Sequence, residues 1–137
     1  MKFKNREEYN KKKFYFLKDD CPFCTKLDAN RIIFESEYWF VTPNNNPYFE
    51  DENWLMAIPK RHMAFTIDLN KQELIDFIEV EKFMNNYYKD KWEYFSFIRQ
   101  SKSNKSVEHM HYHYLVWIPG TTYMNWENVI KIKDWYK

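Results

Sequence analysis

Short apolar runs separated by polar breaks fill the middle of the chain, and they predict β-strands. Residues 32–35 (IIFE) and 38–42 (YWFVT) are rich in β-branched and aromatic side chains, and the polar pair Ser36-Glu37 between them predicts a hairpin. A long polar stretch from residue 43 to 53 predicts a turn. Further strands are expected at residues 54–58 (WLMAI), 94–98 (YFSFI) and around 109–117.

A change of period after residue 70 predicts one long helix. Asn70 followed by Glu73 fits a capping box. Apolar side chains then recur at roughly helical spacing to about residue 89, namely Leu74, Phe77, Ile78, Met84 and Tyr88. With no repeat and no Pro/Gly/Ser-rich linker, we expect one α+β domain, an antiparallel sheet of about five strands with one long helix packed on it. Residues 1–20 are expected to form a basic arm or first helix, and 120–137 a C-terminal tail.

Composition narrows the class of protein. The 137 residues carry a formal net charge of +1, which gives no large field to attract nucleic acid or a membrane surface. No apolar stretch approaches the roughly 20 residues of a membrane span, and the Lys-rich N-terminus lacks the apolar segment of a secretion signal. Both cysteines lie in one CxxC motif, which leaves none for a disulfide framework. We expect a cytoplasmic protein with no membrane partner and no specific nucleic-acid partner.

Three of the four histidines fall at alternate positions, His109, His111 and His113. Alternate side chains of a strand share one face, so these three imidazoles should lie together. The intervening Met110, Tyr112 and Tyr114 would occupy the opposite face, beneath the helix. The histidine face is then expected to be the open one. Solvated surface histidines and, more strongly, a pure metal site are the alternative explanations.

The CxxC motif, CPFC, indicates a metal site. Two thiolates at this spacing can bind one zinc ion, and a tetrahedral site needs two further ligands. Since the chain has no other cysteine, imidazoles must supply them, and His62 just past a strand end is a candidate. A redox CxxC, which opens a helix after a buried strand, and no site at all remain alternatives. His62 could also be an ordinary surface histidine. A zinc site that takes one of the three alternating histidines would leave two for other chemistry.

Several motifs together resemble a known family. HMHYHYL matches the pattern His-φ-His-φ-His-φ-φ, where φ is apolar, and CPFC, PNNNPY, AIPKRH and SVEHMHYH occur in that order over residues 21–119. This part of the chain resembles the zinc-bearing, bacterial-type branch of the histidine-triad family. The family is similar to galactose-1-phosphate uridylyltransferases and diadenosine-polyphosphate phosphorylases. The resemblance implies an antiparallel sheet with a long helix, a homodimer, and 21–119 as the catalytic domain.

The resemblance also implies nucleotide chemistry, with a purine nucleotide as the expected substrate. His111 would attack an α-phosphate and form a covalent nucleotidyl-histidine, while His113 would contact phosphate or orient the nucleophile. The spacer residues Met110 and Tyr112 are not glutamine, which favours hydrolysis of a nucleoside phosphoramidate or dinucleoside polyphosphate over phosphorolysis or transfer. A non-catalytic, zinc-stabilised nucleotide-binding module and a zinc-stapled interaction domain are the alternatives.

The remaining implied roles concern the metal and the phosphate. In zinc-bearing members the first triad histidine is a ligand, which gives a closed structural site of Cys21, Cys24, His62 and His109. Asn44, in an N-x-x-P pattern, would bind substrate; Ser106 would hydrogen-bond the leaving-group side of the phosphate. The family usually has Gly-Gln before this serine, whereas this chain has Asn104-Lys105, so Lys105 would either contact phosphate or point to solvent. EDENW, residues 50–54, stands where the family usually has a Gly-His turn.

Overall fold

The expected five-stranded antiparallel sheet forms the centre of the molecule. The computed structural model describes residues 21–44, 53–90, 93–100 and 107–116, and the backbone of 122–124 and 129–131. The sheet has the order β1-β2-β3-β5-β4, with every neighbouring pair antiparallel. Its strands are β1 (Phe34–Glu35), β2 (Trp39–Pro43), β3 (Leu55–Pro59), β4 (Tyr94–Phe97) and β5 (Tyr112–Val116). This architecture confirms the expected fold class.

The hairpin prediction is confirmed, and the last strand is shorter than predicted. β1 and β2 turn back on each other, with the Ser36 amide donating to the Trp39 carbonyl at 3.0 Å. β5 was expected from about residue 109 but begins at Tyr112. The Met110 amide donates instead to the carbonyl of Met63, at 2.7 Å, in the loop after β3. His109 and His111 therefore precede the strand that carries His113.

The remaining described elements are short, apart from one helix. They are the single turn α2 (Pro22–Thr25), the 3₁₀ turns η3 (Ala29–Arg31) and η4 (Thr66–Asp68), and the long helix α3 (Lys71–Tyr88). A separate antiparallel pair, β6 (Thr122–Met124) and β7 (Val129–Lys131), lies within the predicted tail. Residues 1–20, the predicted basic arm, lie outside the described residues. Among the described helices, none is long and apolar enough to cross a membrane.

Helix α3 begins where the capping box predicts. The Asn70 side chain accepts from the Glu73 amide at 2.8 Å, and the Glu73 carboxylate accepts from the Asn70 amide at 3.0 Å. The predicted apolar stripe is only partly right, because Leu74 and Ile78 are exposed. Leu74 and Ile78 each follow directly after a residue that faces the sheet, and one residue corresponds to a rotation of about 100° around the helix. That inward face carries Glu73, Phe77, Val80, Met84 and Tyr88.

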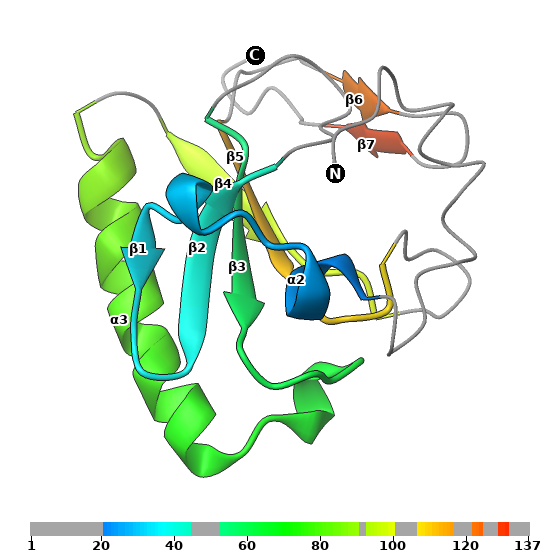
Figure 1. Ribbon diagram of the computed structural model, residues 1–137. Helices are drawn as coiled ribbons and strands as arrows, with labels where there is room; N and C mark the ends of the chain where they lie inside the picture. The colour runs from blue at the N-terminus through cyan, green and yellow to red at the C-terminus, as the bar shows by residue number, and fades with distance from the viewer. Residues whose placement is uncertain are drawn as a thin grey trace.

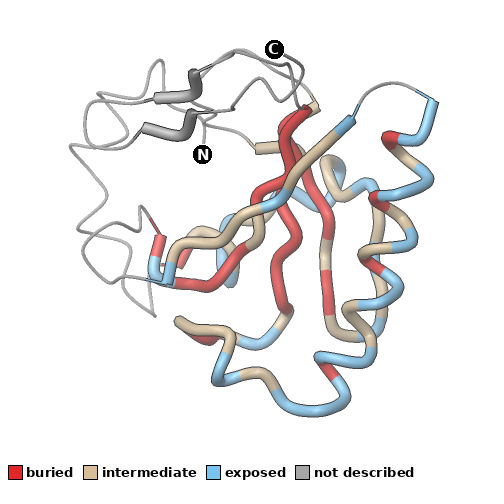
Figure 2. The backbone as a smooth tube through the Cα atoms, turned by 180° about the vertical axis from the view of Figure 1, so that it is seen from behind, coloured by how far each residue is buried: buried red, intermediate tan, exposed pale blue. Residues whose placement is uncertain are grey.

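The core lies between α3 and the sheet, as expected. Met110 and Tyr114 are fully buried there with residues of α3. The Trp39 indole donates to the Glu73 carbonyl at 2.8 Å. The Tyr114 hydroxyl donates to the Glu81 carboxylate at 2.7 Å, and burial raises the pKa of this tyrosine. Figure 2 shows the buried residues following the strands of the sheet, with exposed residues alternating along α3.

The face of the sheet opposite α3 is more buried than the sequence predicted. The histidine face was predicted to be open, but His109, His111 and His113 are only 1%, 9% and 4% exposed. The short α2 turn lies beside β3, on the side of the sheet away from α3 (Figure 1). The Phe23 ring on α2 packs edge-on against the imidazoles of His109 and His111 at centroid distances of 5.8 and 5.0 Å. Among the described residues, His109 and His111 thus lie beneath Phe23 of α2.

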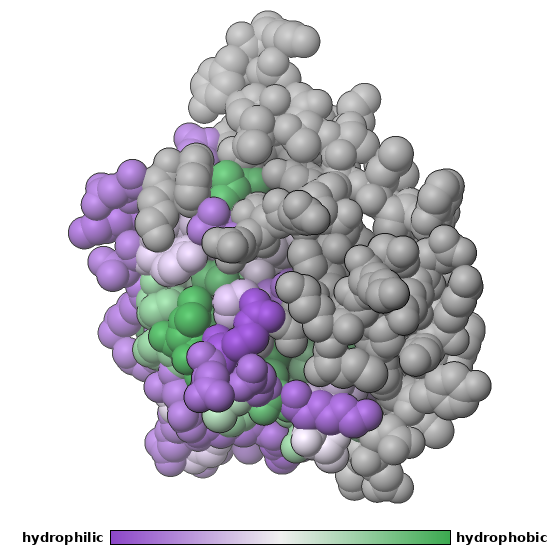
Figure 3. Space-filling view, turned by 45° about the horizontal axis from the view of Figure 1, so that its top comes forward, coloured by the Kyte–Doolittle hydropathy of each residue, from purple (hydrophilic) through white to green (hydrophobic). Residues whose placement is uncertain are grey.

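Elsewhere the described surface mixes polar and apolar side chains. Figure 3 shows an apolar area bordered by strongly polar residues on the described part of the face in view. Large apolar side chains are exposed on the N-terminal half of α3, at Leu74, Ile75 and Ile78. Ile67 in η4, just before α3, is also exposed. In a single chain, helix α3 therefore exposes several large apolar side chains on its outer surface.

Candidate active site and metal centre

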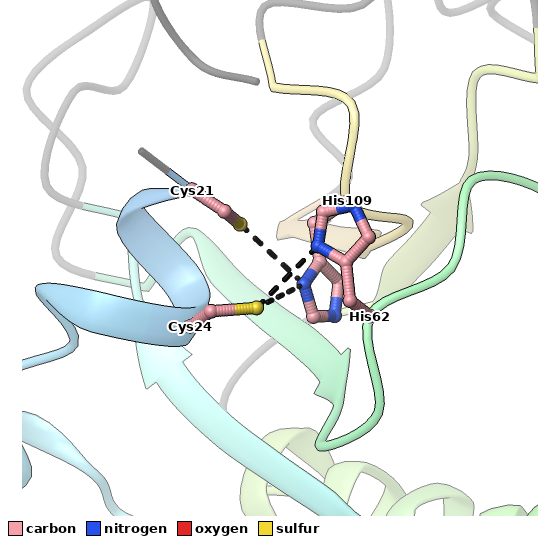
Figure 4. Close-up of side chains that lie close together, drawn as sticks. All are labelled: Cys21, Cys24, His62 and His109. Atoms are coloured by element: carbon pink, nitrogen blue, oxygen red, sulfur yellow. Dashed lines mark hydrogen bonds between the residues drawn. The ribbon is translucent and has the colours of Figure 1, made fainter. Parts of the chain in front are cut away.

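Four side chains from three parts of the chain converge beside α2. Cys21 and Cys24 come from the α2 turn, His62 from the loop after β3, and His109 from the segment before β5; one ligand atom of each lies within 4.8 Å of the others (Figure 4). The Cys24 sulfur is 3.4 Å from Nδ1 of both His62 and His109. The Cys21 sulfur is 3.5 Å from Nδ1 of His109. The structure therefore brings together the four predicted metal ligands.

These distances fit a tetrahedral metal ion. With metal–sulfur and metal–nitrogen bonds of about 2.3 and 2.0–2.1 Å, a tetrahedral site separates sulfur from nitrogen by about 3.6 Å. The outer ring nitrogens also fit. Nε2 of His109 donates to the Pro59 carbonyl at 2.7 Å, and Nε2 of His62 lies 3.3 Å from the Glu108 carboxylate. Both hydrogen bonds leave the lone pair on Nδ1, which faces the sulfurs. The cluster can hold a metal ion.

The cluster has a buried half and an accessible half. Cys21 and His109 are almost completely buried, whereas Cys24 is exposed and His62 is partly exposed. Burial raises the pKa of the Cys21 thiol to about 11. A redox CxxC instead needs a nucleophilic cysteine with a lowered pKa. The surroundings of Cys21 therefore suit a thiol that a cation deprotonates on binding better than a redox motif.

His111 lies next to this cluster and has a different environment. Its Nδ1–H donates to the carbonyl of His109 at 2.8 Å. In a neutral imidazole the other nitrogen, Nε2, then keeps its lone pair. His111 is the most exposed of the three alternating histidines. An imidazole with a lone pair fixed on one nitrogen can act as a nucleophile near pH 7.

His113 is buried on β5 within an aromatic surround. Its ring lies 4.7 Å from that of His111 and stacks on Phe97 at 4.8 Å with an interplanar angle of 21°. The Trp54 indole N–H donates to its Nδ1 at 3.0 Å. The two histidines outside the metal cluster are therefore neighbours with different hydrogen-bond partners.

Solved structures with the same architecture match this chain. A histidine triad protein from Clostridium difficile is 22% identical and superposes with a TM-score of 0.56 over 79% of this chain and 96% of that one. A histidine-triad family hydrolase from Clostridium thermocellum is 24% identical, with a TM-score of 0.59 over 73% and 92%. This chain has the histidine-triad fold.

A third match covers a smaller share of both chains. The Plasmodium falciparum diadenosine triphosphate hydrolase is 20% identical, with a TM-score of 0.57 over 67% of this chain, which spans 64% of that protein. No protein-family model matches the sequence, and no curated protein matches it. At these identities the likeness shows the fold.

The other residues predicted for the triad site fall in two groups. Asn44, partly buried at the end of β2, donates its backbone N–H to the Trp54 carbonyl at 2.8 Å. Its backbone is thus held beside the tryptophan that contacts His113. Ser106 and Lys105 lie outside the described residues. Their predicted phosphate contacts stay predictions.

Sequence reasoning missed several residues around the triad. Phe23 lies within CPFC and was assigned no role, yet it covers His109 and His111. Trp54 was treated as a strand residue, although it stands in the stretch that departs from the family's Gly-His turn. Glu108, directly before His109, gave no signal by its spacing. The departure from the family's Gly-His turn was the one signal in the sequence that singled out this stretch.

Proposed function

We propose that this protein is a nucleotide hydrolase or nucleotidyltransferase that acts at an α-phosphate through a covalent nucleotide on His111. The main observation is the His111 imidazole, whose Nδ1–H is held by a backbone carbonyl and whose Nε2 keeps its lone pair. The shared fold with a diadenosine triphosphate hydrolase and a histidine-triad family hydrolase supports the same chemistry. The proposal therefore joins a local geometry to a fold that is shared with a diadenosine triphosphate hydrolase.

The proposed reaction has two displacements at phosphorus. In the first, Nε2 of His111 forms a bond to the α-phosphorus, and the bond from phosphorus to the leaving group breaks with its electron pair. The leaving group takes a proton from solvent as it departs. In the second, water attacks the nucleotidyl-histidine and loses a proton to solvent, and the phosphorus–nitrogen bond breaks, which releases a nucleoside monophosphate and restores the imidazole. Two steps with a good imidazole leaving group replace one difficult displacement.

The substrate class follows the sequence prediction. We propose a purine nucleoside phosphoramidate or a dinucleoside polyphosphate as substrate, in a cytoplasmic protein. Asn44, Ser106 and Lys105 are proposed to contact the phosphates, and His113 to hydrogen-bond an oxygen of the transferred phosphate. The buried Met110 and half-buried Tyr112 flanking His111 offer no amide in place of the glutamine of the transferase and phosphorylase branches.

The metal is proposed to be a structural zinc ion. Cys21, Cys24, His62 and His109 supply four ligands, which fill a tetrahedral zinc site and leave no position open for substrate. Bound zinc would supply cross-linking stability rather than acid–base chemistry. The four residues would join α2 to the segment that precedes β5, and so hold Phe23 over His109 and His111.

Peptide mass spectrometry tests the nucleophile. The protein is mixed with an AMP phosphoramidate or a diadenosine polyphosphate, quenched and digested, and we expect a nucleotide adduct on His111. His111→Asn should lose the adduct and turnover yet keep the metal, because asparagine cannot accept the phosphoryl group. His109→Asn is the control, and it should lose metal and stability.

The outcomes separate the proposal from its alternatives. His113→Asn should slow turnover by about 10²–10³-fold, as expected when the donor to the reacting phosphate is displaced from the position of the imidazole Nε2–H, with the metal retained. Full activity in His111→Asn would refute the nucleophile. A protein whose melting temperature rises with AMP, but which gains no adduct from any activated nucleotide, would instead be a nucleotide-binding module.

A further inference from the structure

The contact between Trp54 and His113 restricts the protonation of that histidine. Trp54 precedes β3, is buried, and donates its indole N–H to Nδ1 of His113 at 3.0 Å. The two rings meet edge-on, with centroids 5.6 Å apart at 71°. An indole N–H can donate a hydrogen bond and cannot accept one. Nδ1 of His113 must therefore keep its lone pair in this contact, and the proton of the neutral ring lies on Nε2.

The position of the tryptophan is fixed from both sides. Its carbonyl accepts from the Asn44 amide at 2.8 Å. The preceding residue, Asn53, accepts from Tyr88 of α3 through its carbonyl at 2.6 Å and from Tyr87 through its side chain at 3.1 Å. On the other side of the contact, the stacked Phe97 ring holds the plane of His113. A donor and an acceptor fixed in this way favour one tautomer strongly.

The two neighbouring imidazoles consequently differ at the same ring atom. His111 is fixed by a carbonyl acceptor, so its Nε2 carries a lone pair. His113 is fixed by an indole donor, so its Nε2 carries a hydrogen. One ring can attack an electrophile, and the other can donate a hydrogen bond to a developing negative charge. Without the indole, His113 could present a lone pair there, which would repel a phosphate oxygen.

We propose that Trp54 is a positioning residue that holds His113 in the Nε2–H tautomer and so makes it a hydrogen-bond donor in the triad. The tautomer follows from the contact alone, while its effect on turnover rests on the proposed nucleotide chemistry. The residue acts through His113 and is not proposed to touch substrate. In EDENW, the stretch that stands in place of the family's Gly-His turn, Trp54 would then provide a side chain that can donate a hydrogen bond and cannot accept one.

Nitrogen-15 NMR of the histidine side chains, recorded on the full chain without nucleotide, tests the tautomer. In the wild-type protein we expect His113 to show one protonated nitrogen, Nε2, and a scalar coupling across the hydrogen bond between the indole nitrogen of Trp54 and Nδ1. Trp54→Phe keeps a buried aromatic ring and removes the donor, so its His113 shifts should move towards those of a mixture of tautomers.

Trp39→Phe is the matched control. Trp39 is also buried and also donates its indole N–H, but to the Glu73 carbonyl at 2.8 Å. This variant should leave the His113 shifts unchanged. If turnover on the proposed substrates is measurable, Trp54→Phe should lower kcat by about tenfold, less than the 10²–10³-fold typical of a donor that contacts the reacting group directly.

Three results would overturn the proposal. They are an Nδ1–H tautomer for His113 in the wild type, no coupling to Trp54, and His113 shifts in Trp54→Phe that equal the wild-type values. The wild-type spectrum decides the question even if Trp54→Phe fails to fold. The NMR experiment contains no nucleotide, so its result does not depend on the proposed function. Failure to form a His111 adduct would refute that function and leave the tautomer result unaffected.

Discussion

The ion pair between Arg61 and Glu73 allows a quantitative test of how the loop after β3 is held. Glu73 is almost fully buried, and its carboxylate accepts from the Arg61 guanidinium at 2.8 and 3.2 Å and from the Asn70 amide at 3.0 Å. Arg61 also donates to the Asp68 carbonyl at 2.6 Å. Arg61→Met keeps an unbranched apolar stem and removes the charge. The buried carboxylate then loses its ionic partner.

The expected loss of stability follows from the burial of the two partners. Removing one partner of a fully buried ion pair costs about 3–5 kcal/mol. The Arg61 side chain is 51% exposed, so solvent already screens part of the attraction, and we expect about 2–3 kcal/mol at pH 7. For a chain of this length that corresponds to a fall in melting temperature of about 7–10 °C. Urea unfolding at pH 7 measures the difference directly.

The pH dependence gives a sharper test than the magnitude. Burial alone raises the pKa of Glu73, but hydrogen bonds from Arg61 and Asn70, with the Arg61 charge, outweigh it and leave the pKa below its usual value. In the wild type, the stability that Glu73 contributes is therefore present above its unfolded pKa, near 4.3, and is lost as the pH falls through the lower folded pKa.

Arg61→Met should reverse that sign. With the guanidinium gone, burial dominates, and the folded pKa of Glu73 lies above the unfolded one. Stability is then lost as the pH rises through the folded pKa, so the deficit of the variant should be smaller at pH 5 than at pH 7. Lys60→Met, which removes a partly exposed pair with Glu35 at 2.7 Å, is the control and should cost less than about 1 kcal/mol at both pH values. An Arg61→Met deficit that matches this control, or that is equal at pH 5 and 7, would refute the reasoning.

Two further predictions concern the metal and the assembly. Purified protein should carry one zinc ion per chain, and Cys24→Ser should lose it. Glu108→Gln weakens only the hydrogen bond to His62. This variant should therefore still bind one zinc ion, with an affinity about 10–100-fold lower in chelator competition. Equal affinity in Glu108→Gln and wild type would show that the carboxylate does not tune the site. The chain should also be a homodimer at micromolar concentration that covers the exposed apolar residues of α3, and a monomer mass in light scattering would contradict this.

Much of the fold could be predicted because local patterns determine it. The polar pair at 36–37 lies at the turn of the β1–β2 hairpin, and the Asn70–Glu73 capping box marks the start of α3. The continuous apolar run at 54–58 became β3, whose five residues are all buried, because that strand lies in the middle of the sheet. Each of these signals acts within a few residues and needs no knowledge of the tertiary structure.

The errors concern contacts between distant segments. Alternation correctly placed the histidines on the side opposite Met110 and Tyr114, but it could not show that Phe23, more than eighty residues earlier, covers His109 and His111. Helical spacing identified the residues of α3 without fixing which of two adjacent stripes faces the sheet, so Leu74 and Ile78 were misplaced. Which segment packs over a face depends on long-range packing that a period in the sequence does not carry.

The three alternating histidines show why side-chain type and spacing leave their roles open. Their spacing is the same, yet each ring has a different partner: the Pro59 carbonyl for His109, the His109 carbonyl for His111 and the Trp54 indole for His113. These partners direct a lone pair of His109 towards the cysteine sulfurs, fix a lone pair on Nε2 of His111, and put a hydrogen on Nε2 of His113. Two of the three partners are backbone carbonyls, which every residue possesses, so no residue-type signal could have predicted them. The third partner is the Trp54 side chain, so replacing Trp54 is expected to change the chemistry of His113. Replacing Pro59, by contrast, would leave in place the backbone carbonyl that orients His109.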